Sequence, residues 1–355
     1  MNLLPHPPVR QRGMTLVELM VAIALGMLIV AAMAILFANN SRGLAETERS
    51  GQKIENGRYA LELLAGDLHH AGYFSVFDPR QVPLPAAMPD ACATDAASLK
   101  AALALHVQGV DEATTTSLAC LPDIKPGTDI IVTRRASTCV NGSAGCTALG
   151  ANAPAFQASS CSGVAELGSG DVSKYFKLDT STANLTLTRR DCATVAEIRR
   201  YLVRIYYVAN NDVAGDGIPT LKRAELGAGA FSTTSLVQGV EQLQVEWGMD
   251  TTGDGNADVY GASPGTYLGC SPGGSPSCQD QWSSVVSAKV HVLARNLTPT
   301  PGHADKKVYV LGRVADAATG AGDPRQVGPF NDGFKRTVFQ EVVRLQNPSG
   351  RRLTP

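Results

Sequence analysis

Hydrophobic and polar positions divide this chain of 355 residues into an apolar segment near the N-terminus, an amphipathic segment and a long mixed remainder. Residues 19–38 form a run of twenty residues without a charge or a strongly polar side chain. As an α-helix this run is about 30 Å long, which matches the hydrocarbon core of a bilayer. The pattern therefore predicts one membrane-spanning helix.

The helix is expected to continue beyond the membrane, because no proline occurs between Pro8 and Pro79. Apolar residues recur at helical spacing in this second part, which predicts a face that packs against other structure. The residues of this face are Ile54, Leu61, Leu64 and Leu68. Gly72 and Pro79 are expected to end the helix.

The remainder of the chain contains short β-branched or alternating segments, separated by loops rich in glycine, proline and serine. The expected strands are 128–135, 184–190, 201–208, 243–247, 288–294, 307–311 and 338–345. Residues 79–127 are loop-like, and a short helix is expected at 96–106. We therefore expect an α+β fold, in which an antiparallel β-sheet head packs on the long N-terminal helix.

A carboxylate, Glu18, stands at the start of the apolar run, in the segment Arg-Gly-Met-Thr-Leu-Val-Glu-Leu. An acid costs about 2.5–3.5 kcal/mol at the bilayer centre and less near its edge, so Glu18 is expected to have a partner. His6, Arg10 and Arg12 lie in a leader that has no acid before Glu18, whereas the charges that follow the run cancel. By the positive-inside rule, the leader stays in the cytoplasm and everything after Ala38 is exported.

The basic leader, Gly13 and the glutamate five residues beyond it resemble the signal of type IV pilins. In that family a prepilin peptidase cuts after the glycine and methylates the new N-terminus, which here is Met14. The glutamate, here Glu18, meets the N-terminal ammonium of a neighbouring subunit during assembly. The chain departs from the commonest pattern by having methionine rather than phenylalanine at the first mature position, where a bulky apolar residue is needed.

An ordinary secretory signal and a plain membrane anchor are the alternatives to this signal. The apolar run is longer than the core of a secretory signal, and residues 37–41 make a poor cleavage site. A plain anchor does not need a glycine and a glutamate at this spacing. The pilin-type signal is therefore the preferred interpretation.

Four later segments look like parts of PilW-type minor pilins, namely residues 206–211, 217–226, 250–258 and 300–303. With the signal, the resemblance covers roughly residues 10–75 and 195–345, whereas the middle of the chain has no such resemblance. The implied domains are a prepilin leader at 1–13, a transmembrane and filament-core helix at 14–38, a periplasmic amphipathic continuation at 39–75 and a β-rich periplasmic head at 76–355.

The resemblance implies a single-pass protein of the inner membrane, with its head in the periplasm, that is later assembled into the extracellular pilus at or near its tip. Such subunits prime pilus assembly and support twitching motility and adhesion. The implied partners are other minor pilins, the major pilin, the prepilin peptidase, the pilus assembly platform and a tip adhesin. A type II secretion pseudopilin shares the signal and the helix-on-sheet head, and the neighbouring genes would distinguish the two.

A membrane-anchored periplasmic hydrolase is a third alternative. The segment Gly261-Ala-Ser263-Pro-Gly265 fits the pattern G-x-S-x-G, but the proline after the serine has no N–H for an oxyanion hole. The sequence has no P-loop, no zinc-binding His-Glu pair and no G-x-G-x-x-G motif, so we expect no enzymatic activity. The net charge of −1, without a basic stripe, argues against a nucleic-acid partner.

Eight cysteines lie beyond the membrane span, where the periplasm is oxidising, and their even number favours disulfide bonds. The chain has no C-x-x-C, which argues against a zinc ribbon or a thioredoxin-like site. Sequence alone does not fix the connectivity, and pairing between cysteines close in sequence is the most plausible arrangement. These sequential pairs are Cys92–Cys120, Cys139–Cys146, Cys161–Cys192 and Cys270–Cys278.

The segment from Asp250 to Asp258 is the strongest candidate ligand site in the head. Oxygen-bearing side chains alternate along it and its sixth residue is glycine, as in the first half of an EF-hand calcium loop. The expected ligands are Asp250, Asp254, the backbone carbonyl of Asn256 and Asp258. The twelfth residue is Gly261 rather than glutamate, so Ca²⁺ would bind weakly, and no cofactor is required. A turn rich in aspartate and glycine is the alternative.

We predict that the mature protein begins at Met14, because a small residue before the cut lets the peptide enter a protease site at the membrane surface. N-terminal sequencing and the intact mass of the protein from its host check this. A mature chain that begins near residue 40, or an uncut chain, would show that the signal is of another type.

Overall fold

The computed structural model describes residues 13–265, 270, 277–313 and 323–353. The chain divides into two compact units, residues 1–51 and 52–355. Helix α1 (Leu16–His70) runs through both units. It ends before Gly72, whose positive φ of 73° is the left-handed conformation that commonly follows a helix C-terminus. The helix end predicted from the sequence is therefore confirmed.

In the first unit, α1 exposes its apolar side chains along its whole length, and Phe37 is 76% exposed. Its most apolar window of eighteen residues has a mean hydropathy of 2.9 and contains no buried residue. An unburied apolar surface of this kind is stable in lipid rather than in water. Among the described residues, α1 is the single helix that is long and apolar enough to cross a membrane.

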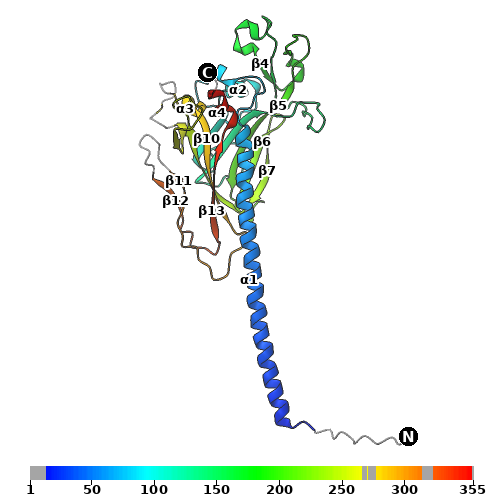
Figure 1. The fold of residues 1–355 in the computed structure, drawn as a ribbon, viewed down its shortest axis with the longest axis vertical. Helices are drawn as coiled ribbons and strands as arrows, with labels where there is room; N and C mark the ends of the chain where they lie inside the picture. Colours follow the sequence, from blue (N-terminus) through cyan, green and yellow to red (C-terminus); the bar gives the residue numbers. More distant parts are fainter. Residues whose placement is uncertain (1–12, 266–269, 271–276, 314–322, 354–355) are drawn as a thin grey trace, which may run out of the picture. The chain divides into compact units, whose positions relative to one another are not determined.

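The second unit contains a large antiparallel sheet, in which seven of the described strands take part (Figure 1). Its main path is β1 (Val107–Ala113), β2 (Thr128–Ala136), β5 (Ile198–Ala209), β3 (Ala155–Ala158) and β4 (Phe176–Asp179), with β6 (Thr220–Leu226) and β7 (Phe231–Gln238) attached through β5. Strand β5 is long enough to pair with β2, β3 and β6 over different parts of its length. It therefore organises the whole sheet.

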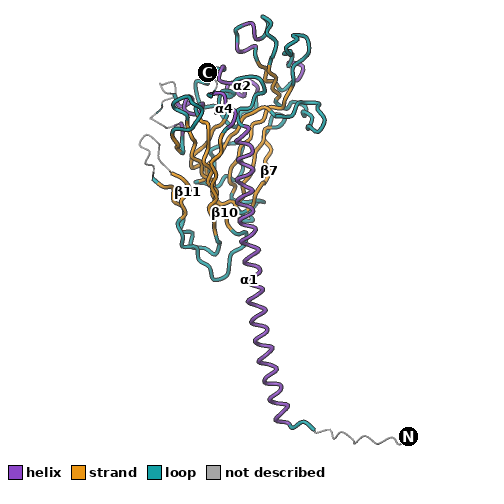
Figure 2. Tube along the Cα trace, viewed as in Figure 1, coloured by secondary structure: helices purple, strands orange, loops and turns teal. Residues whose placement is uncertain are grey.

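Four of the described strands form a second antiparallel sheet, in the order β13 (Arg336–Arg344), β10 (Val285–Arg295), β8 (Val240–Met249) and β9 (Val259–Gly261). Strands β11 (Tyr309–Arg313) and β12 (Pro324–Val327) form a separate hairpin. Short helices lie before, between and after the strands (Figure 2): α2 (Ala96–Ala101), α3 (Cys278–Ser283), α4 (Gln346–Arg352) and the 3₁₀ turns Pro79–Gln81, Leu167–Ser169, Val172–Lys174 and Thr182–Asn184. The α+β class with antiparallel strands is confirmed, although one sheet was expected and the described residues form three, of seven, four and two strands.

The C-terminal part of α1 and the two sheets share one hydrophobic core. Leu61, Leu64 and Leu68 of α1 pack there with Tyr206 of β5 and Val290 of β10. Burial of each leucine contributes about 1.5–3 kcal/mol. The packing face that the sequence predicts for the helix is confirmed at these three leucines.

Helix α1 approaches strand β13 closely at Gly57. A Cβ atom at this position would lie 2.2 Å from the ring of Phe339, so only glycine fits without displacing the ring. Ile54, which was predicted to lie on the packing face, is 40% exposed. The buried face instead passes through Lys53 and Gly57 at this level of the helix.

A second hydrophobic core lies on the other face of the large sheet. Tyr201, Val203 and Ile205 of β5 belong to it, together with Phe74 and Phe156. The alternation along residues 201–208 predicted this shared face correctly. The intervening side chains, such as Tyr206, enter the first core, so both faces of β5 are buried.

A buried ion cluster joins α1 to the large sheet. The Asp67 side chain is 3% exposed and lies 3.0 Å from Nε of Arg135 and 2.9 Å from Nη1 of Arg204. It also accepts a hydrogen bond from the hydroxyl of Thr133. Burial alone would raise the pKa of Asp67, but the two guanidinium groups outweigh it and hold the pKa below its ordinary value. The spacing of apolar residues along the helix does not show that this acid is buried.

Residues 184–190 were predicted as a strand, and this prediction is also wrong. The segment makes a single isolated bridge, from Thr188 to Val195. Its leucines are buried, but the Gln157 side chain satisfies the backbone of Leu187, accepting from its N–H and donating to its carbonyl. A side chain here makes the backbone hydrogen bonds that a neighbouring strand would otherwise make. An alternating sequence pattern does not reveal this.

Several strands escaped the sequence analysis, among them β7 (Phe231–Gln238), which is rich in serine and threonine and mostly exposed. It is an edge strand, so neither face buries enough apolar surface to impose an alternating pattern. Strand β1 falls within residues 79–127, which were expected to be loop-like apart from a short helix. Its sequence Val-Gln-Gly-Val-Asp-Glu-Ala mixes charges with apolar residues, which hides the strand.

A buried histidine connects the two sheets. His106, which precedes β1, is 4% exposed, and its Nε2–H donates to the carbonyl of Val285 in β10 at 2.7 Å. Burial lowers the pKa of His106 to about 4, and the arginines nearby act in the same direction. The folded head therefore holds this imidazole in its neutral form.

We predict that the head loses stability as the pH falls from about 6.5 to about 4. An unfolded histidine takes up a proton near pH 6.5 and folded His106 only near pH 4, so the unfolded state binds more protons in this window. The accumulated loss is about 3 kcal/mol. Thermal unfolding of the detergent-solubilised protein across this pH range measures it.

The matched variants for this test are His106→Gln, which can keep the bond to Val285 without titrating, and His70→Gln on the exposed surface of α1. His106→Gln should flatten the pH dependence, whereas His70→Gln should leave it unchanged. Equal slopes in the wild type and in His106→Gln would contradict the assignment.

Candidate functional site

The N-terminal junction of α1 has a defined geometry. The backbone N–H and the hydroxyl of Thr15 donate to the carboxylate of Glu18 at 2.9 and 3.0 Å. The N–H of Glu18 in turn donates to the Thr15 hydroxyl at 3.3 Å. This reciprocal pair is a capping box, which satisfies amide groups that a helix start leaves free. The sequence analysis missed this role, although the signal Thr-x-x-Glu was present.

Gly13 and Met14 lie before the first turn of α1, outside regular structure. Met14 is 73% exposed, and a Cβ at Gly13 would meet no atom within 4 Å. The peptide bond between them is therefore accessible within this unit. Cleavage there and methylation of Met14 stay predictions.

The Asp250 loop turns its first carboxylate inward. Asp250 is 2% exposed and accepts hydrogen bonds from the N–H groups of Gly253 and Gly255, at 2.6 and 2.9 Å. Its second oxygen also lies 3.4 Å from Nη1 of Arg352 in α4. Gly255 has a positive φ of 80°, and a Cβ there would lie 2.6 Å from the carbonyl oxygen of Ser349. The loop is therefore folded against α4.

The other carboxylates of this loop also bind its backbone. Asp258 accepts from the N–H groups of Thr251 and Thr252 at 2.7 and 3.0 Å, and the Thr251 hydroxyl and these amides lower its pKa. Asp254 accepts from the N–H of Asn256 at 2.8 Å. In the part of the chain that the structure describes, no three His, Cys, Asp or Glu side chains converge as they would around a metal ion. These contacts fit the turn alternative, and calcium binding stays a prediction.

Four disulfide bonds join the eight cysteines in sequential pairs, all of them among the described residues: Cys92–Cys120, Cys139–Cys146, Cys161–Cys192 and Cys270–Cys278. The Cα–Cα distances are between 4.9 and 5.6 Å, within the range of ordinary disulfides. Each bridge closes a loop rather than joining the two sheets. The arrangement is the one that proximity along the chain favours.

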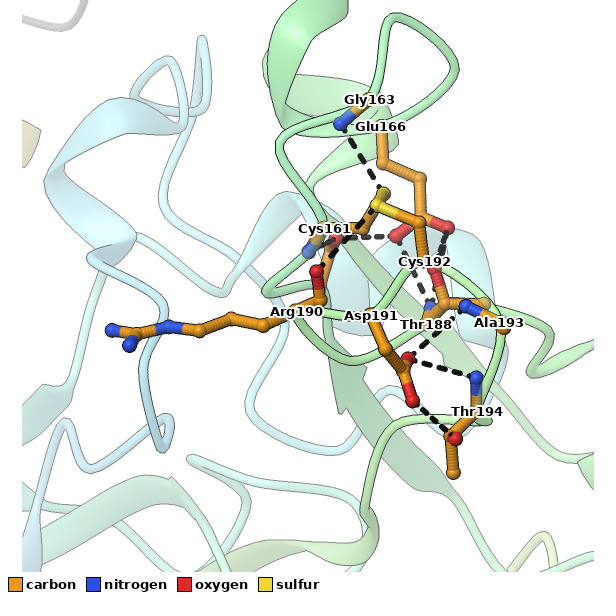
Figure 3. The surroundings of a disulfide bond; sticks show 10 residues. Cys161, Gly163, Glu166, Thr188, Arg190, Asp191, Cys192, Ala193 and Thr194 are labelled. Carbon is orange, nitrogen blue, oxygen red and sulfur yellow. Dashed lines mark hydrogen bonds between the residues drawn. A yellow bond between two sulfur atoms is a disulfide. The ribbon is translucent and has the colours of Figure 1, made fainter.

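The loop closed by Cys161 and Cys192 is supported by two carboxylates (Figure 3). Glu166 accepts from the N–H and the hydroxyl of Thr188, the latter at 2.7 Å, and from the Ser159 hydroxyl. The hydroxyl and amide of Thr194 hold the pKa of Asp191 down to about 2. Neutral donors thus satisfy both acids.

The described part of the G-x-S-x-G segment lacks a feature that a nucleophile elbow needs. Ser263 follows the short strand β9, and the next described α-helix, α3, begins only at Cys278. An elbow needs a helix directly after the serine, with an N–H at the following residue, which is Pro264 here. The described geometry therefore gives no support to the hydrolase alternative.

Two protein families match parts of the chain. Residues 9–34 match the prokaryotic N-terminal methylation motif, and residues 205–347 match the type IV pilus-assembly protein W family. Together the two matches support a PilW-type minor pilin of type IV pili. No curated protein and no solved structure matches it.

The two matches support a general description of the protein as a pilin related to type IV pili. The matched W family is one of pilus-assembly proteins rather than enzymes. The PilW match begins within β5 and ends at the start of α4, so it includes the whole second sheet. Residues 35–204, including β3, β4 and three of the disulfides, lie outside both matches.

We predict that Asp250→Ala destabilises the head by about 1–3 kcal/mol whether or not calcium is present. The change leaves the amides of Gly253 and Gly255 and the guanidinium of Arg352 without their carboxylate. Melting curves of the full protein with millimolar calcium and with a chelator check this, and Asp254→Ala, at an exposed position, is the control. A wild-type melting temperature that rises with calcium, and loses this rise in Asp254→Ala, would establish the calcium site instead.

Proposed function

We propose that this protein is a minor pilin stored in the inner membrane and extracted into a type IV pilus at or near its tip. In this position it primes pilus assembly for twitching motility and adhesion. The observation that carries the proposal is the junction of Gly13, Met14 and Glu18 at the start of an unburied apolar helix, ahead of a PilW-type head. The match to a pilus-assembly family favours the pilus over a type II secretion pseudopilin.

The apolar part of α1 serves in two environments. In the membrane its side chains contact lipid, and in the filament they contact the equivalent helices of other subunits. Its exposed surface is apolar on every side, which suits both surroundings. The subunit is therefore extracted from lipid without exposing a large apolar surface to water.

Glu18 supplies the register of this assembly. Its carboxylate pairs with the N-terminal ammonium of a neighbouring subunit, here the methylated Met14 that cleavage releases. The capping contact with Thr15 supports this role, because it holds the carboxylate at the helix start, next to the chain's own N-terminus. A carboxylate that caps a helix keeps lone pairs for a second donor.

The partners follow from this cycle. The prepilin peptidase processes the junction, and the assembly platform extracts the subunit. Other minor pilins and the major pilin contact α1 and the head, and a tip adhesin is the remaining partner. The head, with its disulfides, is exposed first to the periplasm and then outside the cell.

We predict that Glu18→Ala and Glu18→Gln both reduce incorporation into pili, by about tenfold or more relative to the membrane pool. Glutamine keeps the capping bond to the N–H of Thr15 but removes the charge, whereas alanine removes both. Immunoblots of sheared pili and of membranes from cells that express each variant measure the two pools.

Membrane levels of both variants should stay unchanged or rise, because an apolar helix inserts more readily without a charge. Glu46→Ala, in the part of α1 beyond the apolar run, is the matched control and should assemble normally. Normal incorporation of Glu18→Gln, with loss only in Glu18→Ala, would show that Glu18 acts only as a helix cap. It would contradict the pairing of Glu18 with a neighbour's N-terminal ammonium.

A further inference from the structure

Two adjoining pockets form a groove at the disulfide-closed loop of Cys161 and Cys192. Their volumes are about 370 and 360 Å³, and both are lined by Val76, Ser160 and Arg190. Arg189 and Arg199 line the first pocket, and Leu167 and Tyr175 line the second. Each volume lies within the range of pockets that bind ligands. This Arg190 groove lies within the second unit and outside both family matches.

Three arginines line the groove against two acids. Its two acids are already paired, Glu197 with Arg199, and Asp78 with Arg80 at 2.7 Å. Arg189 and Arg190 are exposed, and no described carboxylate forms an ion pair with either of them. Figure 3 shows the Arg190 side chain pointing away from the disulfide and from the acids beside it.

The nearby acids accept their hydrogen bonds from neutral donors, and Arg189 acts on Asp191 only through its charge. Among the described residues neither Glu166 nor Asp191 accepts a hydrogen bond from Arg189 or Arg190, so both guanidinium groups can bind an outside anion. The turn that carries them is fixed, because the N–H of Cys192 donates to the carbonyl of Arg189 at 2.8 Å and the disulfide holds its end. A backbone fixed in advance lowers the entropy cost of binding.

The same groove presents apolar surface to solvent. The side chain of Val76 is 68% exposed between the two pockets, and Leu167 is 36% exposed at one end. Phe156 is fully buried at the wall of the first pocket. An occupant that fits must therefore supply both anions and apolar groups.

We propose that the Arg190 groove binds an extended acidic peptide segment of a partner protein. Planar guanidinium groups pair with carboxylates through two hydrogen bonds, which suits glutamate or aspartate side chains at Arg189 and Arg190. An apolar side chain of the same peptide packs on Val76. A polyanionic glycan supplies the charge but not the apolar contact, so the peptide is the better match. The proposal goes beyond the pilus role and does not depend on it.

The test uses full-length protein in detergent micelles and a short fluorescein-labelled peptide of alternating glutamate and leucine. Fluorescence anisotropy should show binding that weakens with added salt. The same peptide with glutamine in place of glutamate should bind at least about tenfold more weakly. The double variant Arg189→Gln/Arg190→Gln should weaken binding of the glutamate peptide by about tenfold.

Two further variants separate the parts of the proposal. Val76→Ser should weaken binding about fivefold without changing its salt dependence, because it removes the apolar contact alone. Arg58→Gln, at an exposed arginine of α1 that lines neither pocket, should bind like the wild type. Equal melting temperatures would show that the heads of all variants are intact, which is expected because the substituted side chains are exposed.

Three results would overturn the proposal. One is equal affinity for the glutamate and glutamine peptides, and another is unchanged binding in the double arginine variant. The third is heparin binding more tightly than the peptide, with loss in the double variant but not in Val76→Ser. That last result would assign the groove to a polyanionic glycan.

Discussion

The carboxylate of Asp67 fixes the position of helix α1 along the large sheet. It meets arginines on two neighbouring strands, Arg135 of β2 and Arg204 of β5. Arg204 also pairs with Glu225 of β6 at 2.7 Å, so the network continues across the sheet. Removing one partner of such a buried cluster typically costs 3–5 kcal/mol, because the remaining charges lose their compensation. The leucines of α1 could still pack if the helix shifted along the sheet. The ion cluster could not, because Asp67 would then lose its arginines.

Buried arginines hold other parts of the head in the same way. Arg325 of β12 lies 2.7 Å from Asp111 and 3.3 Å from Asp129, which ties the β11–β12 hairpin to the large sheet. Arg336 of β13 pairs with Asp305 at 2.9 Å and with Glu241 of β8. Long connections with little apolar surface are thus fixed by charge and hydrogen bonding.

Those parts of the fold are predictable from the sequence in which a run or an alternation of apolar residues imposes one kind of structure. The uncharged run of residues 19–38 and the alternation from Tyr201 to Tyr207 predicted the apolar helix and the central strand. Prediction failed where the contact partner of a residue lies far along the chain. No local pattern shows that Asp67 is buried opposite Arg204, or that Gln157 replaces a strand beside Leu187. The Asp250 loop shows the same limit, since one spacing of carboxylates suits both a calcium loop and a self-bonded turn.

The placement of the disulfides has a consequence for how the head responds to its surroundings. The paired cysteines are 7, 8, 28 and 31 residues apart, and none of the eight lies in a β-strand. A cysteine therefore meets its partner early in folding, because short loops close at low entropic cost. No disulfide joins the two sheets, so their shared core is held by packing, buried charge and hydrogen bonds such as that from His106 to Val285. Oxidation thus constrains the loops, including the one that carries Arg189 and Arg190, rather than the contact between the sheets.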